Sequence, residues 1–467
     1  MKLQTKPLLL TYYGDDFTGS TDVMESLSAS GIPTALFLEP PSPDELATFR
    51  LLRSRAGHDG RVSAFGVAGV SRTMTPEQMR ETLPGIFRRI AAHPSRFFHY
   101  KICSTFDSAP SIGNLGVATD LALEAFPSEW VPLIAAAPAL GRYCVFANLF
   151  ARVGNETHRL DRHPTMARHP ITPMAESDLR RHLAQLTDRV VRHVDVHALE
   201  RHAVDGDATV PDFGRDRGFV LFDTLDERHL AAVGELICTR SKPLQQLVVG
   251  SSGVQAAICG HLTDSGERQA LGHDEEGIGT VPGIIAMAGS ASPGTARQIE
   301  HALRIGFADI RINTVALMDR ASREVEISRI VALAAESIAR GRSPMMYTAF
   351  GPDDPMIADT TQRAAEMGDR AASAASVIAG AQGEMLKRLL LQVGARRVVV
   401  AGGDTSGFAA RALRIHALEM CRAIAPGAPL CRAHSADAAL QGLQIALKGG
   451  QNGNERYFES ILRGEVL

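Results

Sequence analysis

The sequence predicts an α/β protein built from two α/β domains with largely parallel sheets. Short apolar runs such as 8–13, 97–102 and 397–401 alternate with segments of helical periodicity. These runs end in charged or glycine-rich residues, as strands do at the ligand-binding edge of an open α/β sheet. The chain has 467 residues, which is too long for one ordinary core, so two domains or even three are expected.

The composition is that of a soluble globular protein, with 45% hydrophobic, 22% charged and 5% aromatic residues. Lys and Arg (49) nearly balance Asp and Glu (52), and the net charge of −3 suggests no nucleic-acid partner. No apolar run reaches the roughly 18 residues that a membrane-spanning helix needs, and the N-terminus lacks a secretory hydrophobic region. The six cysteines never stand at C-x-x-C spacing, which argues against zinc or redox motifs. We therefore expect a cytoplasmic protein.

The first βαβ unit carries the segment around which the chain is organised. A strand over 8–13 leads into the segment 14–20, and a helix follows over 21–29. Asp15 and Asp16 then lie at the carboxyl end of the first strand, where open α/β sheets bind ligands. Two adjacent anions need a cation, a hydroxyl-rich ligand or helix N–H donors. The alternative is that one acid, or a neighbouring threonine, only caps the helix.

Two further strands are expected to deliver polar residues to the same sheet edge. Strand 63–70 is followed by Arg72, which can bind a carboxylate or phosphate bidentately or can be a solvated loop charge. After a helix over 76–91, strand 97–102 delivers the segment 101–108, with a cation, three hydroxyls and an acid. This combination suits a hydroxy acid. Its candidate residues are Lys101, Ser104, Thr105 and Asp107.

The alternation continues to a predicted domain boundary. Further elements of the first half are expected at 131–138, 177–186 (a helix), 218–223 and 247–253. Three histidines of one segment are not spaced to share a helix or strand face, so a loop is favoured over a metal site; they are His158, His163 and His169. Periodicity is lost over 263–283, which predicts a linker between domains at 1–262 and 284–467.

Three glycine-rich turns mark the second half. They are expected at 289–295 after strand 284–288, at 402–407 after strand 397–401, and at 448–454. Other elements are expected at 296–305, 327–339 and 361–392 (helices) and near 345–348 (a strand). Bare backbone N–H groups and helix N-termini bind phosphates, so the three turns together indicate a nucleotide site. Neither the Walker pattern nor G-x-G-x-x-G after the first strand is present, which excludes a P-loop and disfavours a Rossmann dehydrogenase.

Taken together and in this order, these motifs resemble the four-carbon acid sugar kinases over nearly the whole chain. The resemblance implies an N-terminal domain that binds the acid sugar and a C-terminal domain that binds ATP. It implies substrate contacts from Asp15, Asp16, Arg72 and 101–104. It also implies ATP contacts from Ser290, Gly402, Gly403, Asp404, Thr405 and Gly449.

The segment 101–108 departs from the threonate and erythronate kinases of the family, because it lacks an acid and an arginine and gains Asp107. Together with the segment 169–174, it looks like the branch that acts on 3-oxo acids, including 3-oxo-tetronate kinase and 3-oxo-isoapionate kinase. The segment 150–166 does not match the tetronate kinases, so the substrate within the branch stays open.

The resemblance implies a kinase that transfers the γ-phosphoryl group of ATP, with Mg²⁺, to a terminal hydroxyl of a short 3-oxo sugar acid. Asp15 or Asp16 would accept the hydroxyl proton, and Arg72 and Lys101 would hold the substrate carboxylate or oxo group. Ser104 and Thr105 would bind its hydroxyls, and domain closure would exclude water. A homodimer is the default expectation.

Three alternatives remain. The chain could be a non-catalytic sensor of a sugar acid with nucleotide, a threonate or erythronate kinase, or a receiver-like domain with a Mg²⁺ site at the acid pair. The sensor is disfavoured because it has no need to position a proton acceptor. The receiver-like interpretation leaves over three hundred residues and the three glycine turns without a role.

Overall fold

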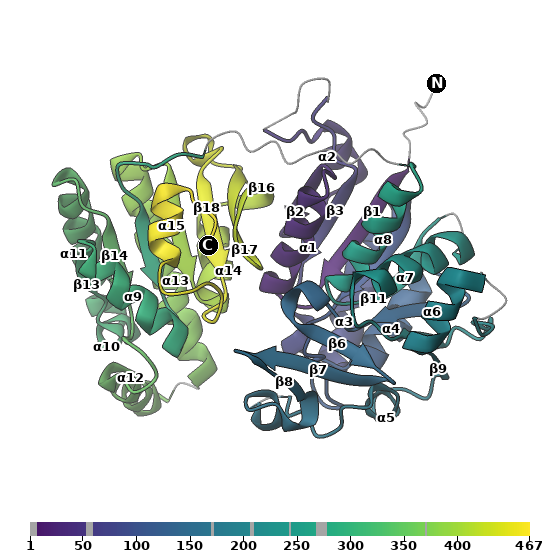
Figure 1. The fold of residues 1–467 in the computed structure, drawn as a ribbon. Helices are drawn as coiled ribbons and strands as arrows, with labels where there is room; N and C mark the ends of the chain where they lie inside the picture. Colours follow the sequence, from purple (N-terminus) through teal and green to yellow (C-terminus); the bar gives the residue numbers. More distant parts are fainter. Residues whose placement is uncertain are drawn as a thin grey trace. The chain divides into compact units, whose positions relative to one another are not determined.

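The computed structural model describes residues 7–52, 59–169, 172–205, 210–241, 244–267, 278–368 and 371–467. The chain forms two compact units, Met1–His273 and Asp274–Leu467. Each unit combines a mostly parallel sheet with helices (Figure 1), which confirms the predicted α/β class. The predicted linker over 263–283 includes 268–277, which lie outside the described residues.

The first unit is built on a parallel sheet with the strand order β2-β3-β1-β4-β11-β5-β10-β9. Its strands are β1 (Leu8–Gly14), β2 (Thr34–Phe37), β3 (Ala64–Ala68), β4 (Ser95–Lys101), β5 (Val131–Ile134), β9 (Val191–Val194), β10 (Phe219–Phe222) and β11 (Gln246–Gly250). A separate antiparallel sheet contains β6 (Arg142–Val145), β7 (Asn148–Val153) and β8 (Glu156–Arg159).

Helices connect these strands. They are α1 (Phe17–Ala29), α2 (Pro43–Thr48), α3 (Pro76–Ala91), α4 (Leu115–Ala125), α5 (Leu179–Leu183), α6 (Val196–Asp205), α7 (Glu227–Arg240) and α8 (Gly253–Asp264). Short 3-10 turns are η1 (Ser71–Thr73), η2 (Pro138–Leu140), η3 (Leu160–Arg162) and η4 (Met166–Arg168).

Aromatic side chains between β1, β4 and the helices on one face form part of the core of the first unit. Tyr13 of β1 stacks on Tyr100 of β4, with ring centroids 5.9 Å apart. Phe98 of β4 stacks on Phe126 at the end of α4 at 3.7 Å, and Phe87 of α3 packs against these rings at 5.5–6.4 Å. Such ring pairs add to the apolar area that they bury. They hold the ends of β1 and β4 in fixed positions.

The second unit has the strand order β13-β14-β12-β15-β18-β17-β16, in which β17 is antiparallel to both neighbours. Its strands are β12 (Ile285–Ala288), β13 (Ala308–Arg311), β14 (Pro344–Tyr347), β15 (Arg397–Ala401), β16 (Ile415–Ala425), β17 (Ala428–Ser435) and β18 (Gln444–Lys448). Its helices are α9 (Pro293–Arg304), α10 (Thr314–Met318), α11 (Arg320–Ala339), α12 (Pro355–Glu366), α13 (Ala371–Val393), α14 (Gly403–Ala412) and α15 (Tyr457–Arg463), with the 3-10 turn η6 (Ala438–Leu440).

Several element boundaries differ from those predicted. The helix predicted over 361–392 is two helices, α12 and α13, and Gly368 with φ +73° lies after the first. Helix α14 begins at Gly403 rather than near Phe408, because Gly402 adopts φ +131° and turns the chain directly from β15 into the helix. The predicted strand 131–138 is shorter, because β5 ends at Ile134 and a 3-10 turn begins at Pro138. The helix predicted over 177–186 is also shorter and corresponds to α5.

Two antiparallel features were not predicted at all. The hairpin β16–β17 and the small sheet β6–β8 carry mixed polar and apolar residues without a clear period, so neither gave a pattern that predicted strands.

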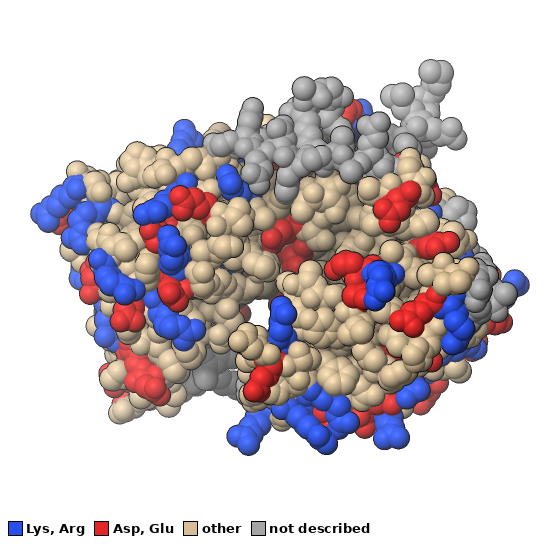
Figure 2. Space-filling view, viewed as in Figure 1, with Lys and Arg blue, Asp and Glu red and all other residues tan. Residues whose placement is uncertain are grey.

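The face shown in Figure 2 carries charged side chains of both signs. On the face in Figure 2, Lys and Arg side chains are interspersed with Asp and Glu side chains. Within the described parts of the chain, no helix is long and apolar enough to span a bilayer.

Candidate active site

The carboxyl ends of β1 and β4 are adjacent at the point where the sheet of the first unit reverses the direction of its connections. The chain leaves β1 towards β2 on one side and leaves β4 towards β5 on the other. Open α/β sheets bind ligands at such a switch point. The backbone N–H of Asp15 donates to the carbonyl of Lys101 over 3.0 Å. The two polar segments that the sequence singled out, 14–20 and 101–108, are therefore joined.

Asp16 begins helix α1. Its Oδ1 accepts a hydrogen bond from the backbone N–H of Gly19 over 2.7 Å, which is an N-cap interaction. The helix consequently starts at Phe17 rather than at the predicted Thr21, and one acid of the pair does cap it. The Asp16 side chain is 27% exposed, and its Oδ2 takes no part in the cap.

Arg72 lies between the two acids. On the turn η1 after β3, it donates to both carboxylate oxygens of Asp15, from Nε over 3.1 Å and from Nη2 over 2.7 Å. Its Nη1 donates to Oδ2 of Asp16 over 2.8 Å. The side chain of Asp15 is only 5% exposed, so this bidentate pair is nearly removed from water. Sequence reasoning expected Arg72 to meet the substrate; in the structure it neutralises the acid pair.

Burial changes the protonation of Asp15. Removal from water and the nearby charge of Asp16 together raise the pKa of this carboxyl to about 6, against the opposing effect of Arg72. The carboxylates in turn raise the pKa of Arg72, which stays positively charged. Asp15 is thus a weakly acidic carboxyl tied to a permanent cation.

Lys101, at the end of β4, is 3% exposed and pairs with Asp22 of α1 over 3.3 Å. Asp107 approaches Arg72 to 3.9 Å. Four carboxyl groups therefore surround two cations: Asp15, Asp16, Asp22 and Asp107 around Arg72 and Lys101. With all of them ionised the cluster carries excess negative charge, so it favours binding a proton or a further cation.

The loop after β4 is organised by short polar contacts. Thr105 Oγ1 donates to Asp107 Oδ1 over 3.0 Å and lies 2.9 Å from the sulfur of Cys103. Burial raises the pKa of the Cys103 thiol to about 11, so this cysteine stays protonated. Phe106 adopts φ +57°, and its fully buried side chain anchors the loop in the core. Ser104 is half-buried and makes no hydrogen bond to another described residue.

The acid predicted at the end of strand 218–223 has a structural role. Asp223 is fully buried and accepts hydrogen bonds from the N–H groups of Phe146 and Ala147, over 2.6 and 2.9 Å, and contacts His193 at 2.9 Å. Phe146 and Ala147 both have positive φ, and Asp223 therefore stabilises the tight turn between β6 and β7.

The three histidines do not form a metal centre. His163 and His169 accept backbone N–H groups of their own turns through Nδ1. His158 lies in β8. Among the described residues, no group of three or more His, Cys, Asp or Glu is arranged to hold a metal ion.

The three glycine-rich turns of the second unit follow three adjacent strands, β12, β15 and β18. The N–H of Gly289 donates to the carbonyl of Ala401, and the N–H of Gly402 donates to the carbonyl of Lys448, both over 2.9 Å. The chain leaves β12 and β15 in opposite directions, so this edge is also a switch point.

The turns touch closely enough to require small residues. A methyl group placed on Gly450 would lie 2.1 Å from Oγ of Ser290, and one on Gly402 would lie 3.3 Å from the backbone nitrogen of Ser290. The turns therefore converge around Ser290. Among the predicted nucleotide residues, Asp404 and Thr405 lie in the first turn of α14.

A pocket of about 280 Å³ opens beside these turns. Gly289, Asp404 and Thr405 line its end at the turns. The rest is lined by apolar and hydroxyl side chains of α10, α12 and α13, including Thr314, Met356, Ile357, Thr360 and Ile378. An apolar pocket with few polar groups beside an anion-binding turn suits a nucleoside joined to phosphates.

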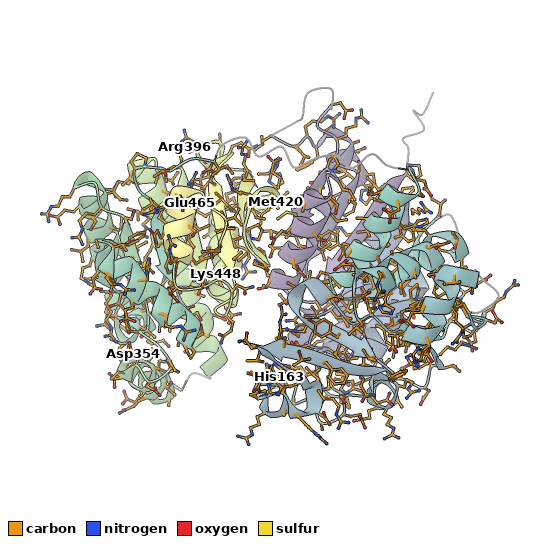
Figure 3. The ribbon with its side chains drawn as sticks, viewed as in Figure 1. His163, Asp354, Arg396, Met420, Lys448 and Glu465 are labelled. Carbon is orange, nitrogen blue, oxygen red and sulfur yellow. The ribbon has the colours of Figure 1, made fainter. Side chains whose placement is uncertain are left out.

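Lys448 ends β18 and is 1% exposed (labelled in Figure 3). Its Nζ donates to the carbonyl of Gly449 over 2.9 Å and lies 5.5 Å from the ring centroid of Tyr457. No carboxylate of the described residues pairs with it, and burial lowers the pKa of Lys448 to about 7.

The structure also brings in residues that the sequence analysis missed. One of them is Asp22 of α1, which pairs with Lys101. Residues three apart share a helix face, so its position three residues after Gly19 could have indicated that it faces the site. Gln382 contacts Thr405 over 3.2 Å from the distant helix α13, and no local pattern could have indicated it.

Comparison with known proteins agrees with this division of roles. Residues 10–258 match the sugar-binding N-terminal domain family, and residues 285–458 match the nucleotide-binding C-terminal domain family. Two solved structures of 23% identity share the fold: a Salmonella typhimurium LT2 protein described as a proposed tRNA synthase (TM-score 0.73, 99% of this chain and 100% of that one) and a Haemophilus influenzae protein of a domain family of unknown function (TM-score 0.69, 97% and 98%).

Curated relatives extend over almost the entire chain. The chain is 41% identical to a 3-oxo-isoapionate kinase of Paraburkholderia graminis, over 98% of this chain and 95% of that protein. It is 29% identical to a 3-oxo-tetronate kinase of Cupriavidus necator (97% and 96%) and 27% identical to one of Pectobacterium atrosepticum (95% and 96%). The chain therefore belongs to the four-carbon acid sugar kinases, phosphotransferases with an alcohol acceptor, and to their branch of 3-oxo acid kinases.

Proposed function

We propose that this protein uses Mg-ATP to phosphorylate a terminal hydroxyl of 3-oxo-isoapionate. The observation that carries the choice of substrate is the 41% identity to a 3-oxo-isoapionate kinase over 98% of the chain, against 26–29% for the 3-oxo-tetronate kinases. The segment 150–166, which lacks the tetronate kinase pattern, is consistent with a different acid skeleton.

Asp16 is the proposed proton acceptor. Its side chain is 27% exposed and its Oδ2 accepts one hydrogen bond from Arg72, whereas both oxygens of Asp15 are held by Arg72 and that side chain is only 5% exposed. In the reaction, the substrate oxygen forms a bond to the γ-phosphorus while the bond from phosphorus to the ADP oxygen breaks. The hydroxyl proton passes to Asp16. Asp15 then acts by fixing Arg72, which orients Asp16 through its third hydrogen bond.

The acid sugar is proposed to bind over the loop after β4. Ser104 offers a hydroxyl with no partner in the described structure, and Thr105 and Asp107 form a connected donor and acceptor pair beside it. Lys101 supplies positive charge, although it is shared with Asp22. The proposed contacts remain those predicted from the sequence, with Arg72 acting chiefly on the acids.

The nucleotide is proposed to bind at the switch point of the second unit. Its phosphates would face the backbone of Ser290, Gly402, Gly403 and Gly449. Its nucleoside would enter the 280 Å³ pocket, with Asp404 and Thr405 between the two. This arrangement stabilises the transferring phosphoryl group by position and by N–H dipoles rather than by covalent chemistry.

Mg²⁺ fits the donor set of the site. Carboxylate oxygens and phosphate oxygens are its preferred ligands, and the acid cluster of the first unit has more carboxylates than cations. Asp404, at the start of α14, is the other candidate ligand because it lines the pocket near the turns. When bound, Mg²⁺ supplies neutralisation of phosphate charge.

The test is ADP release by the purified protein with Mg-ATP and a panel of acids: 3-oxo-isoapionate, 3-oxo-tetronates, threonate and erythronate. We expect kcat/KM for 3-oxo-isoapionate to exceed that for every other acid at least tenfold. The Asp16→Asn protein is the control for contaminating kinases, since it should lose the same turnover.

A 3-oxo-tetronate kinase is the second candidate, favoured by the relatives of 26–29% identity. Preferential turnover of a 3-oxo-tetronate would establish it and reject the isoapionate assignment. Turnover of threonate or erythronate instead would reject the 3-oxo specificity. ATP binding with no turnover on any acid would support the sensor.

We also propose a cytoplasmic location, as expected from the sequence, because the proposed reaction consumes ATP. Sedimentation of the purified chain tests the expected homodimer.

A further inference from the structure

The loop that follows β18 is attached to helix α9 by side chains of that helix. Ser292 Oγ and Thr295 Oγ1 both donate to the carbonyl of Gly450, over 2.7 and 2.9 Å. Ser292 also caps α9 by accepting the N–H of Thr295. The 289–295 turn and the 449–454 loop are therefore one connected element, although they are far apart in the sequence.

Gln298, one turn further along α9, makes the largest set of these contacts. Its Nε2 donates to three successive carbonyls, of Asn452, Gly453 and Asn454, at 3.0, 3.1 and 3.0 Å. The side chain is fully buried, and its Oε1 has no hydrogen-bond partner in the described structure. Only the N–H groups of this buried side-chain amide form hydrogen bonds, so Gln298 acts here as a donor.

The orientation of these carbonyls fixes the N–H groups of the loop. In a trans peptide the carbonyl and the following N–H point in opposite directions. With three successive carbonyls turned to Gln298, the N–H groups of Gly453, Asn454 and Glu455 face away from α9. None of the three has an acceptor among the described residues. Successive N–H groups left free in this way form a concave anion site.

We propose that Gln298 is a positioning residue for nucleotide binding, which holds the carbonyls of the 449–454 loop so that the loop presents its N–H groups to the phosphates. The inference rests on the proposed nucleotide site and goes beyond it, since Gln298 does not touch the nucleotide itself. Thr295 and Ser292 assist by holding the carbonyl of Gly450, next to the predicted contact Gly449.

The test replaces the donor while keeping the shape. Gln298→Met keeps an unbranched buried side chain of similar length and removes the amide N–H groups. We expect the dissociation constant for ATP, measured by calorimetry, and the KM for ATP to rise at least tenfold. The KM for the sugar acid should stay within twofold, because the first unit is unchanged. Ile299→Val, a conservative change at the next buried position of α9, is the control that lowers stability without removing a donor.

A second pair of variants covers the case in which Gln298→Met does not fold. Thr295→Val keeps the shape and loses the hydroxyl, whereas Thr295→Ser keeps the hydroxyl. We expect the first to weaken ATP binding several-fold and the second to bind ATP as the unaltered protein does.

Two results would overturn the inference, and they can be told apart. If the unaltered protein binds ATP and a folded Gln298→Met variant binds it equally well, the positioning role is wrong and the proposed function stands. If the unaltered protein binds no nucleotide, the proposed function fails and the inference fails with it.

Discussion

The two units use one backbone device for two kinds of chemistry. In each, a turn follows a strand at the switch point of the sheet, and its N–H donates to the carbonyl at the end of the neighbouring strand. In the first unit this bond joins Asp15 to Lys101 over 3.0 Å, and in the second it joins Gly289 to Ala401 over 2.9 Å. Both candidate sites therefore lie where the sheet topology predicts ligand binding.

The residues on the turns make the difference. The first turn carries two carboxylates, and Arg72 is drawn in to neutralise them. The second turn carries glycine and serine, and neighbouring glycines allow its backbone to be approached closely. Charged side chains can move a proton, whereas bare N–H groups can only receive an anion. In the proposed function, the same position in a sheet thus serves acceptor activation in one unit and phosphate binding in the other.

The strand-end lysines show the same contrast. Lys101 is paired with Asp22 at 3.3 Å, so its charge is already balanced. Lys448 is equally buried but has only the carbonyl of Gly449 and the ring of Tyr457 beside it. A buried cation without a carboxylate partner is costly unless an anion arrives. This difference also favours the second unit as the phosphate-binding one.

The largest effect is expected from a substitution in the acid pair of the first unit. Asp16→Asn removes the proposed proton acceptor, and we expect kcat to fall by about 10²–10⁴-fold, the usual contribution of a general base. Asparagine is as good an N-cap as aspartate, so α1 and the fold should be preserved. Calorimetry should show that ATP still binds to the second unit with unchanged affinity.

Asp16→Ala separates the two tasks of this side chain. It loses the cap as well as the acceptor, so its thermal midpoint should fall below that of Asp16→Asn at an equally low kcat. Near-normal kcat in Asp16→Asn would show that another group accepts the proton and would move the assignment to Asp15.

A smaller effect is expected on the glycine side. In Gly450→Ala the new methyl group meets Oγ of Ser290 at 2.1 Å, and the turns must separate. We expect the KM for ATP to rise about tenfold, equivalent to about 1.4 kcal/mol of binding free energy, with the KM for the acid unchanged.

Adding Ser290→Gly to Gly450→Ala removes the closest contact of the new methyl group and leaves Oγ of Ser292 at 2.9 Å. It also removes a predicted nucleotide contact. Partial recovery of ATP affinity in the double variant is expected if the close approach matters. If the single variant binds ATP normally, the three turns do not form one site.

The strand ends were predictable because apolar runs and the residues that follow them are local features. Asp15, Asp16 and Lys101 were found in this way, and their meeting at one edge follows from parallel pairing. The α/β class follows from the same alternation. The glycine-rich turns were found for the same reason, since each directly follows an apolar run.

Contacts between distant side chains were not predictable. The sequence placed Arg72 near the acids. It did not show that Nε and Nη2 of Arg72 donate to Asp15 while Nη1 donates to Asp16. Nor could it show that Gln298 on α9 holds a loop more than 150 residues away. The hairpin β16–β17 was missed because its pairing, with shifts in register, leaves no regular alternation.

A pH profile tests the role of Asp15. Because burial raises the pKa of Asp15 to about 6, this group gains a proton as the pH falls through that value. Its hold on Arg72 then weakens, and Arg72 is no longer fixed beside Asp16. We expect kcat/KM for the sugar acid to decrease below pH 6, with a slope that approaches about tenfold per pH unit. In Asp15→Asn the rate should be lower at all pH values and should lack this limb. An identical limb in the variant would assign the titration to another group.

The smallest expected effect is on stability alone and tests Lys448, the buried cation without a carboxylate partner among the described residues. Burial lowers the pKa of Lys448 from 10.5 to about 7, so between these pH values the unfolded chain binds one more proton than the folded one. The stability of the second unit should therefore rise with pH in this window, by at most about 1.4 kcal/mol per unit. Lys448→Met removes this contribution, while every other group titrates as before. Urea denaturation of both proteins at pH 7 and pH 9 should show a smaller gain for the variant. Equal gains would mean that Lys448 keeps its charge in the fold through an anion or water, and its contrast with Lys101 would disappear.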